Sequence, residues 1–354
     1  MRPSDWHPTI SADGKALDGD GLVGLTVLQD TAAPGTFELR VEAWNERAQA
    51  YRYLDTLTEG ATIKIVARDR SGQSRADRSL FVGQLTALEL DIGGDRSSGG
   101  RRAALRLRGY DARHLLMRAR RTRTFQDSTD SEAVRKIAGE LGLSLGGADS
   151  RVRHPFLFQA DQTDYDFIRE RGAAIGFELV AGEAGLEFRP PPLKARPVAT
   201  LDAGDNVLDL QAAISIKSQV DAAQVRGWDV KKKEPFVGRT GGDDPPAFGG
   251  RITGPARAKN AFGAATTDLC DVPVATLAEA EQRARAALRE LALSHITAQV
   301  VAAGDPALVA GSVVTLAKFG ERLSGDYYAA TATHEFDLVL RTYHTSLSLR
   351  RIAS

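Results

Sequence analysis

An alternation of apolar and polar residues runs through the first third of the chain. It is clear in ATIKIVAR, where Ile63 and Ile65 have polar neighbours, and in RAALRLRGY, which carries Leu105 and Leu107. Period-two alternation places apolar side chains on one face of a strand and polar side chains on the other. Short strands of this kind are typical of antiparallel barrels and sandwiches. We therefore expect residues 1–110 to form one β-domain.

Helical signals follow in the middle of the chain. Thr129 and Glu132 fit a capping box, in which each side chain bonds the other residue's backbone amide. Behind them the spacing of one helix face is met by Val134, Ile137, Ala138 and Leu141. A second helix is expected over 163–175, ended by Gly176. With a pair of small strands after it, this part predicts an α/β connecting region over 111–195.

The proline-rich stretch RPPPLKARP removes backbone donors and favours an extended linker. We place a domain boundary there and expect a second β-domain over 196–354. Within it, residues 236–262 are rich in glycine and proline, which predicts a long exposed loop. Thr276 and Glu279 again fit a capping box, so we expect a helix over 276–293.

Composition limits the kinds of partner. Lysine plus arginine and aspartate plus glutamate both number 46, so no overall field attracts nucleic acid or an acidic membrane. Cys270 is the only cysteine, which excludes an internal disulfide and a cysteine-rich zinc site.

The sequence shows no sign of a membrane span or an export signal. No apolar run is long enough to cross a membrane, and the charged start MRPSDWHPTISADGK does not resemble a signal peptide. We expect synthesis in the cytoplasm and export only as part of a larger particle.

Several patterns that might carry chemistry lack the required context. The G-x-G-x-x-G pattern at 19–24 precedes a strand-like run, whereas a dinucleotide site follows a strand, so we interpret it as a turn. The arginines within 118–123 and the lysines at 231–233 lack interleaved aromatics, which favours solvated faces or protein contacts over nucleic-acid recognition. His334 and Glu335 belong to no metal or nucleophile motif. The sequence therefore predicts no catalytic, metal or cofactor site, and no enzyme.

Two segments, 156–180 and 304–337, resemble a known family. They are similar to the phage late-control D family, the baseplate hub proteins of contractile tails, and to the front portion of the valine–glycine-repeat spike proteins of type VI secretion. We call the matching positions the family-motif residues. They are Gln159, Asp164, Asp166 and Phe167 in the first segment, and Gly304, Pro306, Gly311, Gly325, Tyr327 and His334 in the second.

The resemblance implies a β-rich α+β fold with two antiparallel β-barrel-like domains joined by helical and small-strand elements. It also implies a homotrimer whose six barrel domains form a pseudo-sixfold ring. Such a ring would act as the structural baseplate hub of a phage tail, a phage-tail-like bacteriocin or an extracellular injection particle. Its partners would be a hexameric tail tube, a trimeric spike and other baseplate proteins.

The resemblance also implies a contact for the C-terminal end of the chain. The sequence stops at Ser354 soon after the last expected strand, so we expect the spike to be a separate protein. The resemblance places this end on the spike-facing side of the trimer. Arg350, Arg351 and Ile352 are therefore the candidate spike interface.

Two other functions compete with the hub. A tail-associated cell-wall hydrolase would need catalytic residues of its own, and the hub-like layout already accounts for every segment. A carbohydrate-binding β-protein would be favoured by clustered exposed aromatics, but only 6% of the residues are aromatic.

Overall fold

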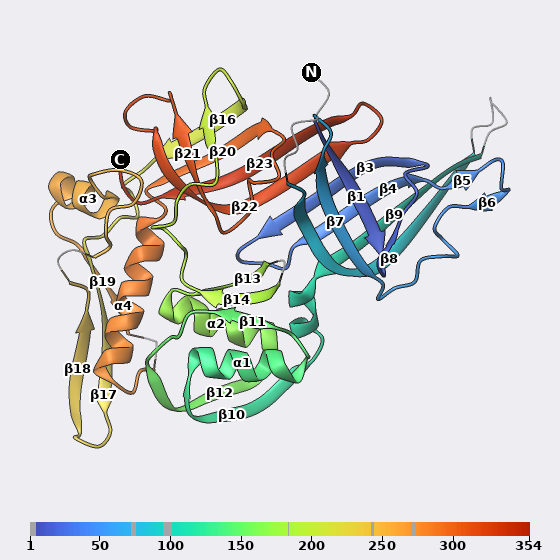
Figure 1. Ribbon diagram of the computed structural model, residues 1–354. Coiled ribbons are helices and arrows are strands. Elements are labelled where there is room, and N and C mark those ends of the chain that lie inside the picture. The colour runs from blue at the N-terminus through green and yellow to red at the C-terminus, as the bar shows by residue number, and fades with distance from the viewer. Residues whose placement is uncertain (1–4, 72–75, 95–100, 183, 242–243, 271–272) are drawn as a thin grey trace.

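Antiparallel strand pairing dominates the architecture (Figure 1). The computed structural model describes residues 5–71, 76–94, 101–182, 184–241, 244–270 and 273–354. Of the described residues, 49% lie in strands and 16% in helices, which confirms the β-rich fold with large antiparallel sheets. Among the described residues, no helix is both long and apolar enough to cross a membrane.

The first β-region begins at residue 6 and ends at residue 111. Its strands are β1 (Trp6–Ala12), β2 (Lys15–Ala16), β3 (Leu22–Asp30), β4 (Thr36–Glu42), β5 (Trp44–Asn45), β6 (Ala50–Tyr51), β7 (Thr62–Asp69), β8 (Arg78–Gly94) and β9 (Arg101–Asp111). The alternating residues Ile63, Ile65, Leu105 and Leu107 are all buried in its core. This confirms the strand pattern predicted there.

The middle region lies below the two β-rich parts in Figure 1. It contains a short 3-10 helix (Ala112–Met117), β10 (Arg120–Thr129), α1 (Asp130–Glu140), β11 (Leu145–Gly147), β12 (Arg153–Thr163), α2 (Asp164–Ile175), β13 (Glu178–Gly182) and β14 (Gly185–Arg189). The capping box at the start of α1 is confirmed, as is the left-handed Gly176 after α2. Phe125 of the β10–β12 ribbon stacks on Phe167 of α2 at a centroid distance of 5.6 Å.

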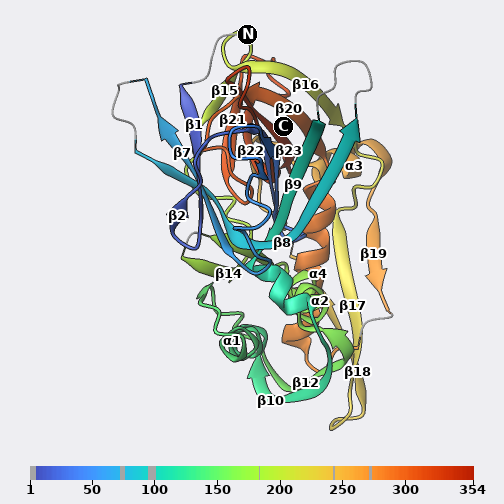
Figure 2. The same ribbon diagram turned by 90° about the vertical axis from the view of Figure 1, so that its right-hand side faces the viewer.

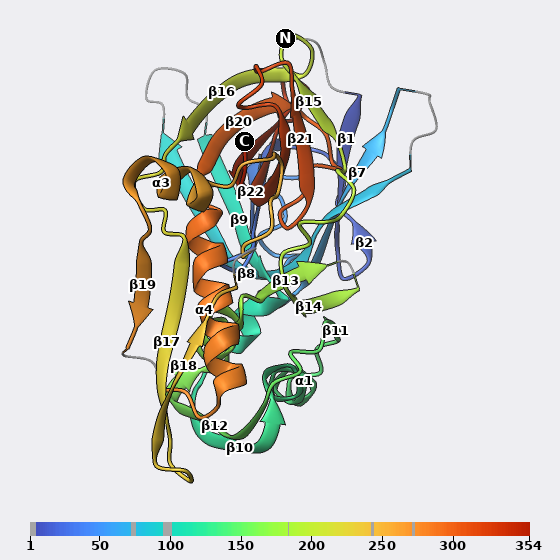
Figure 3. The same cartoon turned by 90° about the vertical axis from the view of Figure 1, so that its left-hand side faces the viewer.

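The remaining elements form the C-terminal β-region and a lateral extension. They are β15 (Thr200–Asp202), β16 (Val207–Ile214), β17 (Ala222–Asp229), β18 (Glu234–Arg239), α3 (Gly254–Phe262), β19 (Thr266–Leu269), α4 (Leu277–Ala292), β20 (Ile296–Ala303), β21 (Val313–Ala317), β22 (Gly325–Asp337) and β23 (Thr342–Arg351). The small sheet β18-β17-β19 makes up the extension, and α4 runs beside it (Figure 3).

The two β-regions share one 13-stranded sheet. Its main path is β16-β20-β23-β22-β3-β4-β9-β8-β7-β1-β2, and β22 pairs with β3 where the regions meet. Phe336 and Tyr343 from the C-terminal β-region stack at 3.9 Å inside the core of the first β-region. The division into domains at 1–110, 111–195 and 196–354 stays a prediction.

The helix predicted over 276–293 is α4, with one change at its start. The Thr276 side chain accepts a hydrogen bond from the backbone amide of Glu279, as expected. The Glu279 carboxylate reaches back to the amide of Ala275 instead of that of Thr276. Two ion pairs one turn apart lie along this helix, Glu279 with Arg283 at 3.4 Å and Glu281 with Arg285 at 3.8 Å.

The long exposed loop predicted over 236–262 was wrong. Strand β18 extends into this range, and α3 occupies its end with Thr253 as the N-cap. Phe248 is buried against Leu293 and Ile352. Proline suits the first turn of a helix, and Pro255 lies in the first turn of α3.

A buried arginine fastens the middle region to the first β-region. The Arg113 guanidinium donates to the Asp111 carboxylate at 2.7 Å and to the backbone oxygens of Asp30 and Leu179, each at 2.9 Å. Because an unpaired buried charge is costly, these partners hold the three segments together. The end of β9, the end of β3 and β13 therefore meet at one point.

Candidate functional site

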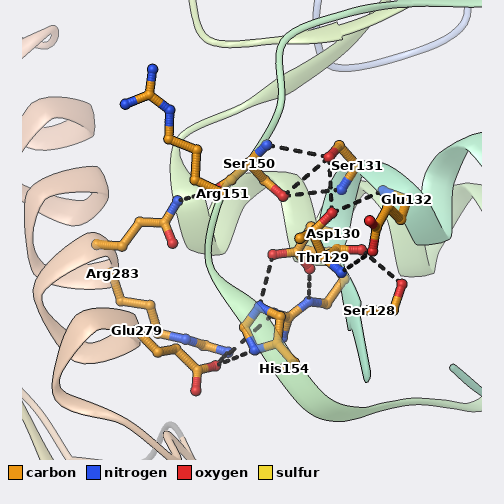
Figure 4. Close-up of polar contacts among 12 residues, drawn as sticks. Ser128, Thr129, Asp130, Ser131, Glu132, Ser150, Arg151, His154, Glu279 and Arg283 are labelled. Atoms are coloured by element: carbon orange, nitrogen blue, oxygen red, sulfur yellow. Dashed lines mark hydrogen bonds and ion pairs between the residues drawn. The ribbon is translucent and has the colours of Figure 1, made fainter. Parts of the chain in front are cut away.

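A buried polar network joins the start of α1, strand β12 and helix α4 (Figure 4). The His154 ring lies between two carboxylates. Its Nε2 is 3.1 Å from an oxygen of Asp130, and its Nδ1 is 3.5 Å from an oxygen of Glu279. The three side chains are at most 7% exposed. Folding thus brings the middle region and α4 together around one imidazole.

Two arginines balance the charge of these carboxylates. Arg171 of α2 donates to Asp130 at 2.5 Å, and Arg283 of α4 donates to Glu279 at 3.4 Å. Burial alone would raise the pKa of Asp130, but hydrogen bonds from His154 and Arg171 outweigh it and hold this pKa below its usual value. Burial, aided by the nearby charge of Arg171, lowers the pKa of Arg283.

The network does not have the geometry of a catalytic triad. Such a triad needs a hydroxyl within hydrogen-bond reach of a histidine nitrogen. Both nitrogens of His154 face carboxylates, while the Ser131 hydroxyl bonds Asp149 at 3.1 Å. In the described part of the chain, no group of three or more metal-ligating side chains could hold a metal ion. What the network can do is hold three elements in fixed positions.

A groove beside this network exposes apolar side chains. Strand β12 supplies Phe156 and Phe158, and the end of β17 supplies Trp228 with Val230 just beyond it. Each of these four side chains is more than half exposed. The two phenylalanine rings stack at 6.2 Å. Clustered apolar side chains on a surface mark a place where a partner can bind.

The first group of family-motif residues builds the inside of the middle region. Arg123 of β10 donates to Gln159 at 2.8 Å and to Asp164 at 2.5 Å, and Gln159 also donates to Asp164. Asp166 accepts from the Thr163 hydroxyl at the start of α2, and Phe167 lies in the core. These residues join β10, β12 and α2; Gln159, Asp164 and Phe167 are buried, and the Asp166 side chain is partly exposed.

The second group of family-motif residues is also structural. It consists of Gly304, Pro306, Gly311, Gly325, Tyr327 and His334, on or beside the strands of the C-terminal β-region. A Cβ atom at Gly304 would lie 2.1 Å from the Tyr343 ring, and Gly325 has a φ of 138°, which only glycine adopts readily. His334 is fully buried.

The predicted spike-interface residues lie in different environments. Arg351 and Ile352 are 1% and 0% exposed. Arg351 donates to the backbone oxygens of Leu323 and Ser324 at 3.1 and 3.0 Å. Arg350 is partly exposed and pairs with Glu290 of α4 at 2.8 Å. The interface stays a prediction, and of the three residues only Arg350 has an accessible side chain in the single chain.

Sequence comparison identifies the family. A family model described as the Alg8 N-terminal domain matches residues 53–337, which is most of the chain. The chain belongs to this family. The description names a domain and no activity, so membership alone assigns no reaction. No curated protein matches the sequence.

Solved structures show that this member of the Alg8 N-terminal domain family has the fold of tail proteins. The 43 kDa tail protein of prophage MuSo2 from Shewanella oneidensis matches with a TM-score of 0.69 and 13% identity, over 98% of each chain. A tail protein from Neisseria meningitidis matches with a TM-score of 0.67 and 13% identity, over 98% of this chain and 97% of that one. An E. coli component of the type VI secretion system matches with a TM-score of 0.58 and 12% identity, over 98% of this chain and 77% of that one.

Proposed function

We propose that the chain is the baseplate hub of a contractile injection system, a structural part that adapts a hexameric tail tube to a trimeric spike. The observation that carries the proposal is the fold. Over 98% of its length the chain matches a phage tail protein, and it also matches a component of the type VI secretion system. The proposed role is assembly and not catalysis.

The arrangement of the two β-regions suits this role. They lie side by side in one sheet, joined through β22 and β3. Three copies of the chain would therefore present six β-regions around an axis. Closed rotational symmetry is the usual form of soluble oligomers. The face formed by six β-regions can match a hexameric tube, while the rest of the trimer keeps threefold symmetry for the spike.

The groove with Phe156, Phe158 and Trp228 favours carbohydrate binding as a second candidate function, because aromatic rings can stack on sugars. The hub is the better candidate. Two of the three rings are phenylalanines and Val230 lies beside them, a composition suited to an apolar protein segment. Carbohydrate binding in the groove predicts that cell-wall oligosaccharides change the fluorescence of Trp228. Unchanged fluorescence favours the hub.

The hub proposal predicts that the chain joins tube and spike as a trimer. When tube, hub and spike proteins are co-expressed, a tagged spike is expected to recover the tube only if this chain is present. The recovered hub should have the mass of three copies, measured by light scattering or native mass spectrometry. The matched control omits the hub. Recovery of the tube without it, or a hub that stays monomeric with both partners, would contradict the proposal.

Charge reversal at Arg350 is expected to weaken spike recovery, because this side chain lies at the proposed spike-facing end and remains accessible. Arg350→Glu removes a solvent-accessible ion pair with Glu290 and a hydrogen bond to the backbone oxygen of the same residue, so the free energy of unfolding should change by about 1 kcal/mol or less. Lys318→Glu removes a comparable pair, with Asp202, and serves as the control. Equal spike recovery by the Arg350 variant, the control and the unaltered chain would exclude the interface role.

A further inference from the structure

A second hollow, away from the buried network and its groove, lies where α3 meets the C-terminal β-region. Figure 2 and Figure 3 show α3 beside the end of β16 and the start of β20. The hollow has a volume of about 430 Å³, which is in the range of small-molecule sites. Its lining includes Ile214, Ile216, Ile252, Arg257, His295 and Arg322. We call it the α3 hollow.

The histidine in the α3 hollow has one nitrogen without a partner. His295 is 0% exposed, and its Nδ1 lies 3.1 Å from the backbone oxygen of Ser215. A carbonyl oxygen can only accept, so Nδ1 carries the hydrogen and Nε2 is an acceptor in the neutral ring. Among the described residues, Nε2 has no hydrogen-bond partner. The hollow therefore contains a buried acceptor that needs a donor.

The surroundings of His295 favour its neutral form. Burial and the positive charges of three arginines lower its pKa. These arginines are Arg257 of α3, Arg322 between β21 and β22, and Arg351 of β23. A ring that stays neutral keeps Nε2 as an acceptor near neutral pH.

Positive charge in the α3 hollow is not balanced by the chain itself. The Nε of Arg257 is buried and has no hydrogen-bond partner in the part of the chain that the structure describes. Neither Arg257 nor Arg322 forms an ion pair with a described residue, and Asp221 near the end of α3 is already paired with Lys259 at 3.0 Å. Because an uncompensated charge in a partly buried place is costly, this arrangement favours a bound anion.

A phosphate group that keeps one proton meets both needs. Its P–OH can donate to Nε2 of His295, and its other oxygens can accept from Arg257 and Arg322. A sulfate or carboxylate ion has no proton to donate near neutral pH, so it would leave Nε2 without a partner. A water molecule could bridge the two buried nitrogens, but it would leave both guanidinium charges unbalanced.

The rest of the α3 hollow suits an organic group. Ile252 is 46% exposed, and Ile214 and Ile216 are half-buried. The hollow is much larger than a phosphate ion. An apolar group attached to the phosphate would cover these isoleucines and gain affinity from the burial.

We propose that the α3 hollow binds a small phosphate monoester, with its phosphate between Arg257, Arg322 and His295 and its organic group against the three isoleucines. The two arginines balance the phosphate charge, and the histidine accepts the hydrogen of the P–OH group. This binding function goes beyond the proposed assembly role and does not depend on it, because every residue involved belongs to a single chain.

Isothermal titration calorimetry of the 354-residue chain tests the site with three probes: phenyl phosphate, inorganic phosphate and sulfate. At pH 6 about half of a phosphate monoester keeps its last proton, since its second pKa is about 6. At constant ionic strength, phenyl phosphate is expected to bind with a Kd below about 1 mM. It should bind about tenfold or more tighter than sulfate, because it can donate to His295. Inorganic phosphate should bind about threefold or more weaker than phenyl phosphate, because it lacks the ring.

The pH dependence identifies the donated proton. Raising the pH from 6 to 8 removes the last proton of phenyl phosphate, while His295 stays neutral. The affinity for phenyl phosphate should therefore fall by about tenfold or more, and the weak affinity for sulfate should not change. Sulfate that binds as tightly as phenyl phosphate at pH 6 would overturn the proposal, as would equal affinity for phenyl phosphate at both pH values.

Two charge-removing variants locate the site. Arg322→Gln changes an exposed side chain of the hollow, so the fold should be kept while the affinity for phenyl phosphate falls by about tenfold. Arg251→Gln is the matched control, because it removes the same charge from an exposed residue outside the hollow. It should leave the affinity within about twofold.

Three further outcomes would contradict the assignment. Equal losses in the Arg322 and Arg251 variants would show a general attraction of anions and no defined site. Equal affinities for inorganic and phenyl phosphate would exclude the contact of the organic group with the isoleucines. No binding of any probe would mean that the hollow holds only water. Each of these results would leave the hub proposal in place, because recovery of tube and spike does not depend on the α3 hollow.

Discussion

Lowering the pH from about 6.5 to about 3 is expected to destabilise the chain through His334. This side chain is fully buried where β22 meets β3, and burial lowers its pKa to about 3. In the unfolded chain the pKa of histidine is about 6.5. Between these values the unfolded state binds a proton that the folded state does not. Stability therefore falls as the pH falls, by about 1.4 kcal/mol per unit and by about 4 kcal/mol over the whole window.

Urea unfolding between pH 7 and pH 4.5 measures this effect. His334→Gln does not titrate in this range, so its stability should depend much less on pH than that of the unaltered chain. Tyr343→Phe is the matched control. It removes the hydroxyl that lies 2.7 Å from the His334 ring but leaves the ring buried, so it should keep the steep dependence. An unchanged slope in His334→Gln would assign the acid sensitivity to other groups.

Local signals in the sequence predicted α1, α2 and α4, because a helix start depends on residues three apart. Thr129 and Glu132 cap α1 as their spacing predicts. The loop over 236–262 was wrong because Phe248 is buried by Leu293 and Ile352, which lie far along the chain. The pairing of β3 with β22 joins strands about 300 residues apart. The residue pattern of neither strand identifies the other as its partner.

In the candidate site, too, local sequence patterns indicate some features, while contacts between distant residues appear only in the fold. The alternation that places Leu347 and Leu349 in the core continues to Arg351, so the period of two already indicated a buried arginine there. Arg351 was nevertheless expected beside Arg350 in the spike interface, although it is only 1% exposed. By contrast, no spacing rule connects Asp130, His154 and Glu279. They meet because α1, β12 and α4 pack together, and only the fold reveals the network.

Removing the Asp130 carboxylate is expected to cause the largest loss of stability of any change proposed for the buried network. Its side chain is 0% exposed and is the nearest acceptor of Arg171, at 2.5 Å. In Asp130→Ala, Arg171 and Arg283 would share Glu279, which lies 4.0 and 3.4 Å from them. Breaking a buried ion pair from one side typically costs about 3–5 kcal/mol, because it leaves an uncompensated charge.

Chemical denaturation of three variants at pH 7 tests this expectation. Asp130→Ala should lose about 3–5 kcal/mol of unfolding free energy. Asp161→Ala is the control, because it removes the same group from an exposed pair with Arg120 and should lose less than about 1 kcal/mol. Adding Arg171→Met to Asp130→Ala should recover part of the loss by removing the unpaired charge.

The pH dependence gives a further check on Asp130, because its pKa is lowered in the folded chain. Its contribution is present above the unfolded value of about 4 and is lost as the pH falls through the folded value. The difference between Asp130→Ala and the unaltered chain should therefore shrink below pH 4 and stay constant between pH 5 and 7. A loss at pH 7 no larger than that of Asp161→Ala would show that the network does not hold α1, β12 and α4 together.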